Sequence, residues 1–248
     1  MGDVTEPTRV AYGDGPSQFA ELTRPAGASR GVVVVLHGGF WKAAYGAELG
    51  RPLAARVAQL GWSAWNVEYR RVGSGGGFPQ TFDDVHAAVE KLADQLPAGG
   101  LETVVALGHS AGGHLATWAA ARSRFDRWRP SRVAVSHVVS QAGVVDLSAA
   151  AETGLGGDAV QGLMGVGPGD PAFDEADPCR QLPLDVPVWC VHARDDDTVP
   201  FAQSADYVAA ATAAGAEATL VEVSGGHFGV IDVTAPAWAR VEGILAAL

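Results

Sequence analysis

The sequence has little of what several classes of protein need. It contains two cysteines, Cys179 and Cys190, and lacks the dense cysteine spacing of a disulfide-bonded secreted domain, so we expect free thiols. No apolar run approaches the length that crosses a membrane. Positive charge is also scarce, because 17 Lys and Arg stand against 28 Asp and Glu, a formal net charge of −11. Such an acidic chain repels phosphates, so neither nucleic acid nor an anionic membrane is an expected partner.

Length and composition predict the general architecture. With 248 residues, 48% of them hydrophobic, residues 1–248 are expected to form one domain around a buried sheet. The opening residues, MGDVTEPTRV, lack the apolar core of a signal peptide, so we expect a cytoplasmic protein. Residues 148–183 are rich in Gly, Pro and Asp and predict a minimal cap-like insertion, mostly loop with one or two short helices. The oligomeric state stays open.

Apolar runs alternate with helical patterns along the chain, which predicts a parallel sheet with helices on both faces. We expect strands at 32–36, 62–69, 104–107, 133–145, 186–192 and 218–223, and helices at 45–60, 81–96, 113–121, 202–214 and 234–248. Residues 10–12 and 19–22 flank a Gly-Asp-Gly-Pro turn and predict a hairpin, and Thr81 is a candidate helix cap. In such sheets chemistry gathers at the carboxyl ends of the strands.

Residues 103–117, TVVALGHSAGGHLAT, contain the most informative motif. The apolar run before Gly108 predicts a strand, and a helical pattern follows Gly112. A serine between glycines on a tight strand-to-helix turn is typical of a nucleophile elbow, whose strained backbone lifts the hydroxyl above the sheet edge. Ser110 is therefore the predicted nucleophile. The alternative is a glycine-rich turn with an incidental serine.

A serine nucleophile needs a base to remove its proton and an acid to orient that base. After an elbow serine, the acid precedes the histidine in the chain. Of seven histidines, only His227 lies beyond the acidic cluster Asp195-Asp196-Asp197, so His227 is the predicted base. The residues alone leave the identity of the acid open, because clustered aspartates often only solvate a loop or cap a helix.

A second glycine motif, His37-Gly38-Gly39-Phe40, follows the strand at 32–36. Backbone N–H groups without neighbouring side chains can face a bound oxyanion, so we expect an oxyanion hole formed by the N–H groups of Gly39, Phe40 and Ala111. The residues expected to line a substrate pocket are Trp41, Tyr45, Met164, Phe201 and Phe228.

The remaining histidines near these motifs are His109, His114 and His192. A metal site would need converging ligands supported by further hydrogen bonds, and the spacing of these residues does not predict one. We expect the three side chains to pack in the interior, and we predict neither a metal nor another cofactor.

These motifs together resemble the esterase and arylformamidase (kynurenine formamidase) branch of the α/β-hydrolases. Marks of that branch are His-Gly-Gly-aromatic-Trp, matched by 37–41, and Gly-His-Ser-Ala-Gly-Gly-His-Leu-Ala, matched by 108–116. Residues 192–200 are similar to the His-Gly-x-x-Asp-x-x-Val-Pro pattern common in α/β-hydrolases, with Ala193 in place of the glycine. That alignment selects Asp196 as the acid, with Asp195 as the alternative. The resemblance implies the α/β-hydrolase fold, a mostly parallel sheet of about eight strands.

The expected function is hydrolysis of a small carboxylic ester through an acyl-enzyme, with a short acyl group and an aromatic leaving group stacked beside Phe40 and Trp41. An arylformamidase acting on N-formylkynurenine-like amides is the first alternative. Two others are a peptidase related to prolyl oligopeptidase, although the chain has no room for a propeller domain, and a hydrolase-fold receptor that binds small molecules without turnover.

Overall fold

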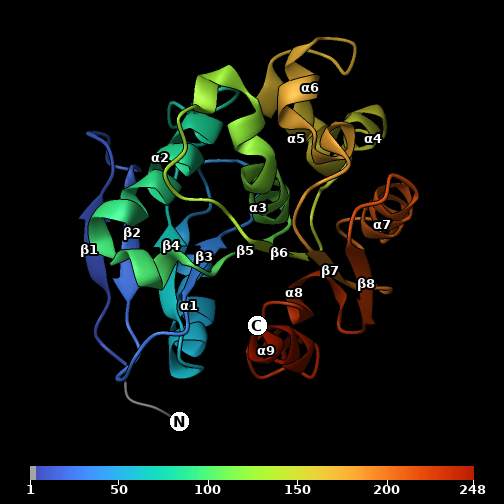
Figure 1. Ribbon diagram of the computed structural model, residues 1–248. Helices are drawn as coiled ribbons and strands as arrows, with labels where there is room; N and C mark the ends of the chain where they lie inside the picture. Colours follow the sequence, from blue (N-terminus) through green and yellow to red (C-terminus); the bar gives the residue numbers. More distant parts are fainter. Residues whose placement is uncertain (1–3) are drawn as a thin grey trace.

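The computed structural model describes residues 4–248, and within them eight strands form one sheet in the order β1-β2-β4-β3-β5-β6-β7-β8 (Figure 1). The strands are β1 (Thr8–Ala11), β2 (Phe19–Thr23), β3 (Val32–Leu36), β4 (Ser63–Val67), β5 (Val104–His109), β6 (His137–Gln141), β7 (Val188–Ala193) and β8 (Ala218–Val223). β1 and β2 form the predicted hairpin and pair antiparallel, whereas the strands from β4 to β8 along the sheet are parallel. The architecture is the predicted α/β-hydrolase fold.

Helices cover both faces of this sheet (Figure 1). They are α1 (Arg51–Gln59), α2 (Gln80–Gln95), α3 (Ala111–Ala121), α4 (Leu147–Glu152), α5 (Leu155–Met164), α6 (Ala172–Ala176), α7 (Ala202–Ala213), α8 (Gly226–Gly229) and α9 (Trp238–Ala247). α1 and α9 enclose one apolar core, and α2, α3 and α7 enclose a larger one on the opposite face. Because both faces are covered, β3, β4 and β5 are buried at every position, which explains the continuous apolar runs at 32–36 and 104–107.

Several predicted elements need correction. The apolar stretch 133–145 forms a strand only over β6, because residues 142–145 continue as a buried loop that begins with Ala142 at φ 47°. The predicted helix 45–60 divides at Gly50 into a 3₁₀ turn, Ala47–Leu49, and α1. Thr81 does not cap α2. Its hydroxyl instead donates to the Arg70 carbonyl at 2.6 Å and accepts from the Gly77 N–H at 3.0 Å.

The cap is more helical than predicted. Between residues 147 and 181 it contains α4, α5, α6 and a 3₁₀ turn, Pro178–Gln181, rather than mostly loop. The buried carboxylate of Asp177 holds these pieces together by accepting the N–H groups of Leu147 and Ser148, the Ser148 hydroxyl and the Cys179 N–H, at 2.7–3.2 Å. The Asp177 carboxylate therefore stabilises the cap, because it satisfies backbone N–H groups that the starts of α4 and the 3₁₀ turn leave without partners.

Two glycines bring β3, β5 and α3 into close contact. A Cβ atom on Gly108 would lie 2.0 Å from the carbonyl oxygen of Gly112, and a Cβ atom on Gly112 would lie 2.0 Å from that of Leu36. No side chain fits at either position, since real Cβ atoms do not approach backbone oxygens so closely. Helix α3 can therefore begin directly above the sheet edge. Its first turn fixes how far Ser110, the residue before it, stands above that edge.

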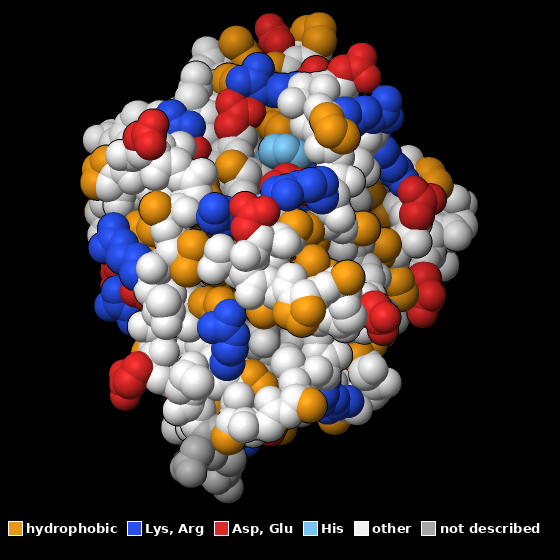
Figure 2. Space-filling model, turned by 60° about the vertical axis from the view of Figure 1, so that its left-hand side comes forward, with side chains coloured by type: hydrophobic (Ala, Val, Ile, Leu, Met, Phe, Trp, Pro, Cys, Tyr) orange, Lys and Arg blue, Asp and Glu red, His pale blue; other side chains and the backbone are white. Residues whose placement is uncertain are grey.

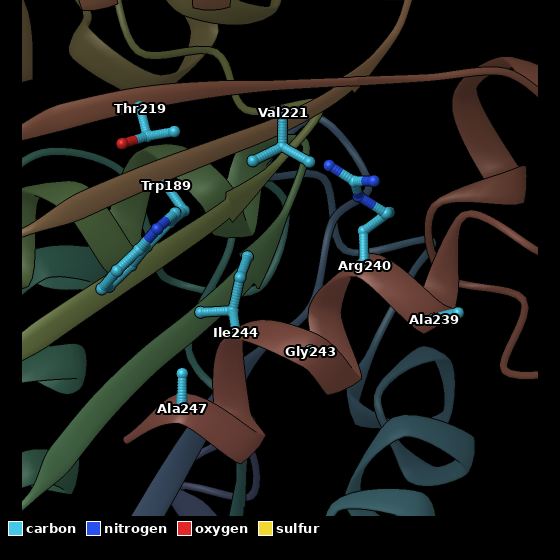
Figure 3. Close-up of a pocket in the computed structure, with 8 residues that line it drawn as sticks. All are labelled: Trp189, Thr219, Val221, Ala239, Arg240, Gly243, Ile244 and Ala247. Carbon is cyan, nitrogen blue, oxygen red and sulfur yellow. The ribbon is translucent and has the colours of Figure 1, made fainter.

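The surface of the protein offers two further observations. On the face shown in Figure 2, Lys and Arg side chains are scattered among Asp and Glu rather than gathered in one patch. A groove of about 480 Å³ is lined by Trp189 of β7 and Val221 of β8 on one side and by Gly243 and Ile244 of α9 on the other (Figure 3). Among residues 4–248, no helix is both long enough and apolar enough to span a membrane.

The contact at Gly112 generates a stability prediction. Gly112→Ala places a methyl group against the Leu36 carbonyl, and overpacking of this kind costs about 3 kcal/mol or more. We expect urea unfolding to show that loss. Gly99→Ala is the matched control, because no atom lies within 4 Å of a Cβ there, and it should change stability by less than about 0.5 kcal/mol. A Gly112→Ala protein with the unfolding midpoint of the unmodified chain would contradict this packing.

Candidate active site

The turn between β5 and α3 has the geometry of a nucleophile elbow. Ser110 has φ 55° and ψ −119°, a strained conformation for a residue with a side chain. Its N–H donates to the Gln141 carbonyl at 2.9 Å, and its own carbonyl accepts the N–H groups of His114 and Val144 at 3.1 and 3.3 Å. The strain persists because these three hydrogen bonds and the glycine contacts hold the backbone from both sides.

The predicted acid and base meet at the same edge of the sheet. Asp196 follows β7, and His227 lies on α8, a single helical turn. The Nδ1–H of His227 donates to Oδ2 of Asp196 at 2.7 Å, and the Asp196 side chain is fully buried. This hydrogen bond fixes the tautomer in which Nε2 of His227 has a free lone pair, the form that can accept a proton.

Asp196 is held as an anion by several donors. The Thr198 and Val199 N–H groups each donate to its Oδ1 at 2.8 Å, while both histidines, His227 and His192, point to its Oδ2. Burial opposes ionisation, but these hydrogen bonds outweigh burial and hold the pKa of Asp196 well below its usual range. The carboxylate therefore stays charged throughout the pH range in which an enzyme of this kind would work.

The neighbouring aspartates have other partners. Asp195 is exposed and accepts the Gly225 N–H at 3.1 Å, which anchors the start of the base-bearing turn. Asp197 is also exposed and accepts the Thr198 hydroxyl at 3.1 Å. In this structure only Asp196, among the three, contacts the His227 ring, so the geometry favours Asp196 over the alternative Asp195.

His192 is a part of this site that the sequence reasoning missed. It is fully buried, and its Nε2 lies 3.2 Å from Oδ2 of Asp196 and 3.1 Å from the Val199 carbonyl. Both partners are acceptors, so Nε2 carries the hydrogen, and Nδ1 accepts the Ser204 hydroxyl at 2.8 Å. The sequence signal for this contact is the position of His192 four residues before Asp196, whereas packing in the interior is the prediction given above.

Ser110 and His227 are brought to one region but are not hydrogen-bonded. Among residues 4–248 the Ser110 hydroxyl has no hydrogen-bond partner. His109, the residue before Ser110, brings the two together, because its ring centroid lies 4.5 Å from that of His227. Hydrogen bonds of this kind are often long in a free enzyme and shorten only when substrate is bound.

The glycine loop after β3 lies against the elbow. A Cβ atom on Gly38 would be 3.1 Å from the Cβ of Ser110, and Gly39, Phe40 and Trp41 have φ of 111°, 52° and 54°. Within the described chain, the N–H groups of Gly39 and Phe40 donate to no protein acceptor. With the N–H of Ala111 at the start of α3, they are free donors beside the serine, as an oxyanion hole requires.

The five predicted pocket residues lie in different environments. Trp41 is buried, and its Nε1–H donates to Nδ1 of His114 at 3.2 Å. Met164 is also buried, and Phe201 is partly covered by His192. Tyr45 and Phe228 are 45% and 65% exposed, and they are the large exposed hydrophobic side chains of residues 4–248. Tyr45 covers Gly39 of the glycine loop, and Phe228 directly follows His227.

The remaining predictions concern histidines and metals. His114 is buried, and its Nε2–H donates to the Ala176 carbonyl of the cap at 2.9 Å, which agrees with a packing role. Burial lowers the pKa of His114 to about 4, so this ring is neutral. Over residues 4–248 no three His, Cys, Asp or Glu side chains converge as metal ligands would.

Comparison with known proteins places these features in a class. The sheet topology and the elbow are those of an α/β-hydrolase, and solved esterases superimpose on nearly the whole chain. Esterase B from Lactobacillus rhamnosis, solved with a tributyrin phosphonate inhibitor, has a TM-score of 0.82 and 21% identity, over 99% of this chain and 84% of that one. Propionate-bound esterase Est2 from Thermogutta terrifontis has a TM-score of 0.77 and 20% identity, over 98% and 93%.

A family model narrows the assignment. The BD-FAE model, which describes esterases of the α/β-hydrolase type, matches residues 22–210, well over half of the sequence. The chain therefore belongs to the BD-FAE family. No curated protein sequence matches it significantly.

The hydrogen bonds of Asp196 generate a kinetic prediction. Asp196→Asn keeps the shape but lets the His227 ring take the wrong tautomer, so kcat/KM for an ester substrate should fall on the order of 10⁴-fold, as in triads of known enzymes. Asp197→Asn, at an exposed position, should stay within about threefold of the unmodified enzyme. The measurement is steady-state hydrolysis of phenyl acetate. Equal losses in the two variants would remove Asp196 from its assigned role.

Proposed function

We propose that this protein is a serine hydrolase that cleaves small carboxylic esters through an acyl-enzyme, with Ser110 as nucleophile, His227 as base and Asp196 as the acid that orients it. The observation that carries this proposal is the buried Asp196–His227 hydrogen bond beside a strained serine turn. Membership of the BD-FAE esterase family supports the same reaction.

The reaction follows from the positions of these groups. Nε2 of His227 takes the hydroxyl proton of Ser110 while Oγ attacks the ester carbonyl, and the developing oxyanion accepts the N–H groups of Gly39, Phe40 and Ala111. The carbon–oxygen bond to the leaving group breaks, and the leaving oxygen takes the proton from His227. Water then attacks the acyl-enzyme by the same route, releasing the carboxylic acid and restoring the serine.

The proposed acyl group is short. The helices of the cap are short, so a long acyl chain has little additional apolar wall against which to pack, and each CH₂ left in water forgoes about 0.8 kcal/mol. The solved esterases with similar folds were captured with short acyl groups, as a tributyrin phosphonate, propionate and butyrate. These neighbours support acetyl to butyryl esters as substrates here.

The aromatic surface available to a leaving group differs from the expectation. Trp41 is buried against His114, and the ring of Phe40 packs on Gly156 of the cap, where a Cβ atom would lie 2.4 Å from it. The exposed rings are those of Tyr45 and Phe228, which border the glycine loop and the base. We propose that an aryl leaving group stacks on one or both of them.

Formyl amides are the second candidate substrates. The His37–Trp41 motif resembles that of arylformamidases, and a formyl group is the shortest acyl group such a site could accept. An amine leaves less readily than an alcohol, so we place ester hydrolysis first. A receptor without turnover has no comparable support, because the chain carries a complete set of Ser110, Asp196 and His227. A peptidase would use the same three residues, but no observation favours it over an esterase.

The proposal is tested first at the nucleophile. A fluorophosphonate probe should label the unmodified protein at Ser110, and Ser110→Ala should abolish both labelling and nearly all ester turnover while leaving the urea unfolding curve unchanged. Mass spectrometry of the labelled peptide identifies the site. Turnover at the normal rate by folded Ser110→Ala protein would disprove the mechanism.

Substrate preference is tested with a panel of phenyl esters from acetyl to decanoyl, with N-formylkynurenine alongside. We expect kcat/KM to be greatest at two to four acyl carbons and to decline by eight, because the longer chains gain no additional burial. A maximum at eight carbons or more would refute the short-acyl proposal. Turnover of the formyl amide far above every ester would make formamide hydrolysis the leading function.

The leaving-group contact has its own control in the same assay. Phe228→Ala and Tyr45→Ala should raise KM for phenyl acetate about fivefold, the equivalent of one lost aromatic contact, with kcat largely kept. Ethyl acetate has no ring to stack, so its KM should stay constant in both variants. Identical changes for the two esters would show that these rings do not contact the leaving group.

A further inference from the structure

His109, the last residue of β5, occupies a position that the proposed mechanism does not use. Its side chain is buried, and its Nε2 lies 2.9 Å from the carbonyl oxygen of His227. A carbonyl only accepts, so Nε2 carries the hydrogen and donates it. One imidazole, next in sequence to the nucleophile, therefore holds the main chain of the base.

α8, the turn that carries His227, needs such a hydrogen bond to restrain its main chain. α8 is a single turn, Gly226–Gly229, which follows Gly225 at φ 116° and begins with Gly226 at φ 66°. Glycines leave the backbone free to take many conformations, so this segment is not rigid by itself. On either side it is held by Asp195, which accepts the Gly225 N–H, and by Gln141, whose amide donates to the Val230 carbonyl. At His227 the side chain is held by Asp196 and the carbonyl by His109.

The same ring also contacts the glycine loop. A Cβ atom on Gly38 would lie 3.0 Å from Nδ1 of His109, so the imidazole fills the space between the loop after β3 and α8. Its ring lies 4.5 Å from that of His227 between centroids, at an interplanar angle of 46°. His109 thus contacts the glycine loop and α8, and it is bonded covalently to Ser110. These are the three segments that carry the oxyanion donors, the base and the nucleophile of the proposed mechanism.

The His109 ring is neutral, although a protonated ring could donate the same hydrogen bond. Burial, together with the adjacent His227 ring, lowers the pKa of His109 to about 3, although the His227 carbonyl and Asp196 favour its protonation. His192 also contributes to lowering the pKa of His109. A neutral His109 leaves the Asp196 carboxylate available to the base, whereas a charged one would place a second cation beside the ring that must carry a proton during the reaction.

We propose that His109 is a positioning residue, which fixes the main chain of His227 through its Nε2–H···O=C hydrogen bond and so keeps the base within reach of Ser110. The inference rests on the proposed serine hydrolase function, and it deepens that function by assigning a role to the residue before the nucleophile.

The test compares two substitutions at this position. Gln can place an amide N–H close to where His carries its Nε2–H, whereas Leu fills similar space without a donor. In His109→Leu we expect kcat for phenyl acetate to fall about tenfold per active site, the rate equivalent of one neutral hydrogen bond, with KM within twofold. His109→Gln should recover to within about threefold of the unmodified enzyme. Titration with a phosphonate counts the active sites, so misfolded protein does not affect the comparison.

A second readout does not depend on activity. Amide hydrogen exchange of residues 225–231 should be faster in His109→Leu and unchanged in His109→Gln. His137→Leu is the control, since His137 lies at the start of the neighbouring β6 and stacks on Trp189 away from the site. Normal kcat and exchange in His109→Leu, or equal losses in the Leu and Gln variants, would overturn the inference. Absence of phosphonate labelling at Ser110 in the unmodified protein would instead refute the proposed function, and the exchange comparison would still decide the role of His109.

Discussion

The contact between Gly112 and the Leu36 carbonyl is the constraint on which the site depends. It allows α3 to begin directly above β3 and β5, and the chain can reach that position only through the strained turn at Ser110. Gly38 also lies against the serine, and Ala111 is the first residue of α3. The proposed nucleophile and oxyanion donors are thus held by close packing of backbone, which tolerates less displacement than flexible side chains would.

The hydrogen bonds of Asp196 follow from the burial of its carboxylate. A carboxylate without access to water is costly unless donors replace its hydration, and Asp196 has two backbone and two imidazole donors. Because His192 also bonds Ser204 and the Val199 carbonyl, the orientation of the acid is tied to β7, α7 and the loop between them. The site is therefore supported by the packed body of the domain more than by the loops that carry its reactive atoms.

The sequence predicted the fold well where burial and secondary structure coincide, as in β3, which is buried at every position. It failed where burial occurs outside the sheet, because the apolar residues 142–145 fill a loop and look the same as strand residues. The order of motifs predicts Ser110 and His227 as nucleophile and base, whereas it gives no indication of the direction of the aromatic side chains. That direction depends on the positive φ of Phe40 and Trp41, a property that neither residue type indicates.

The packing of Phe40 on Gly156 links the glycine loop to the cap. The two residues are far apart in sequence, yet any side chain at 156 would overlap the ring at 40, and Lys42 donates to the Gly156 carbonyl at 3.1 Å. In evolutionary terms, a larger residue at position 156 is expected only together with a smaller one at position 40. The cap and the glycine loop should therefore diversify as a coupled pair, so that exchanging either one alone between relatives would disturb the donors beside the nucleophile.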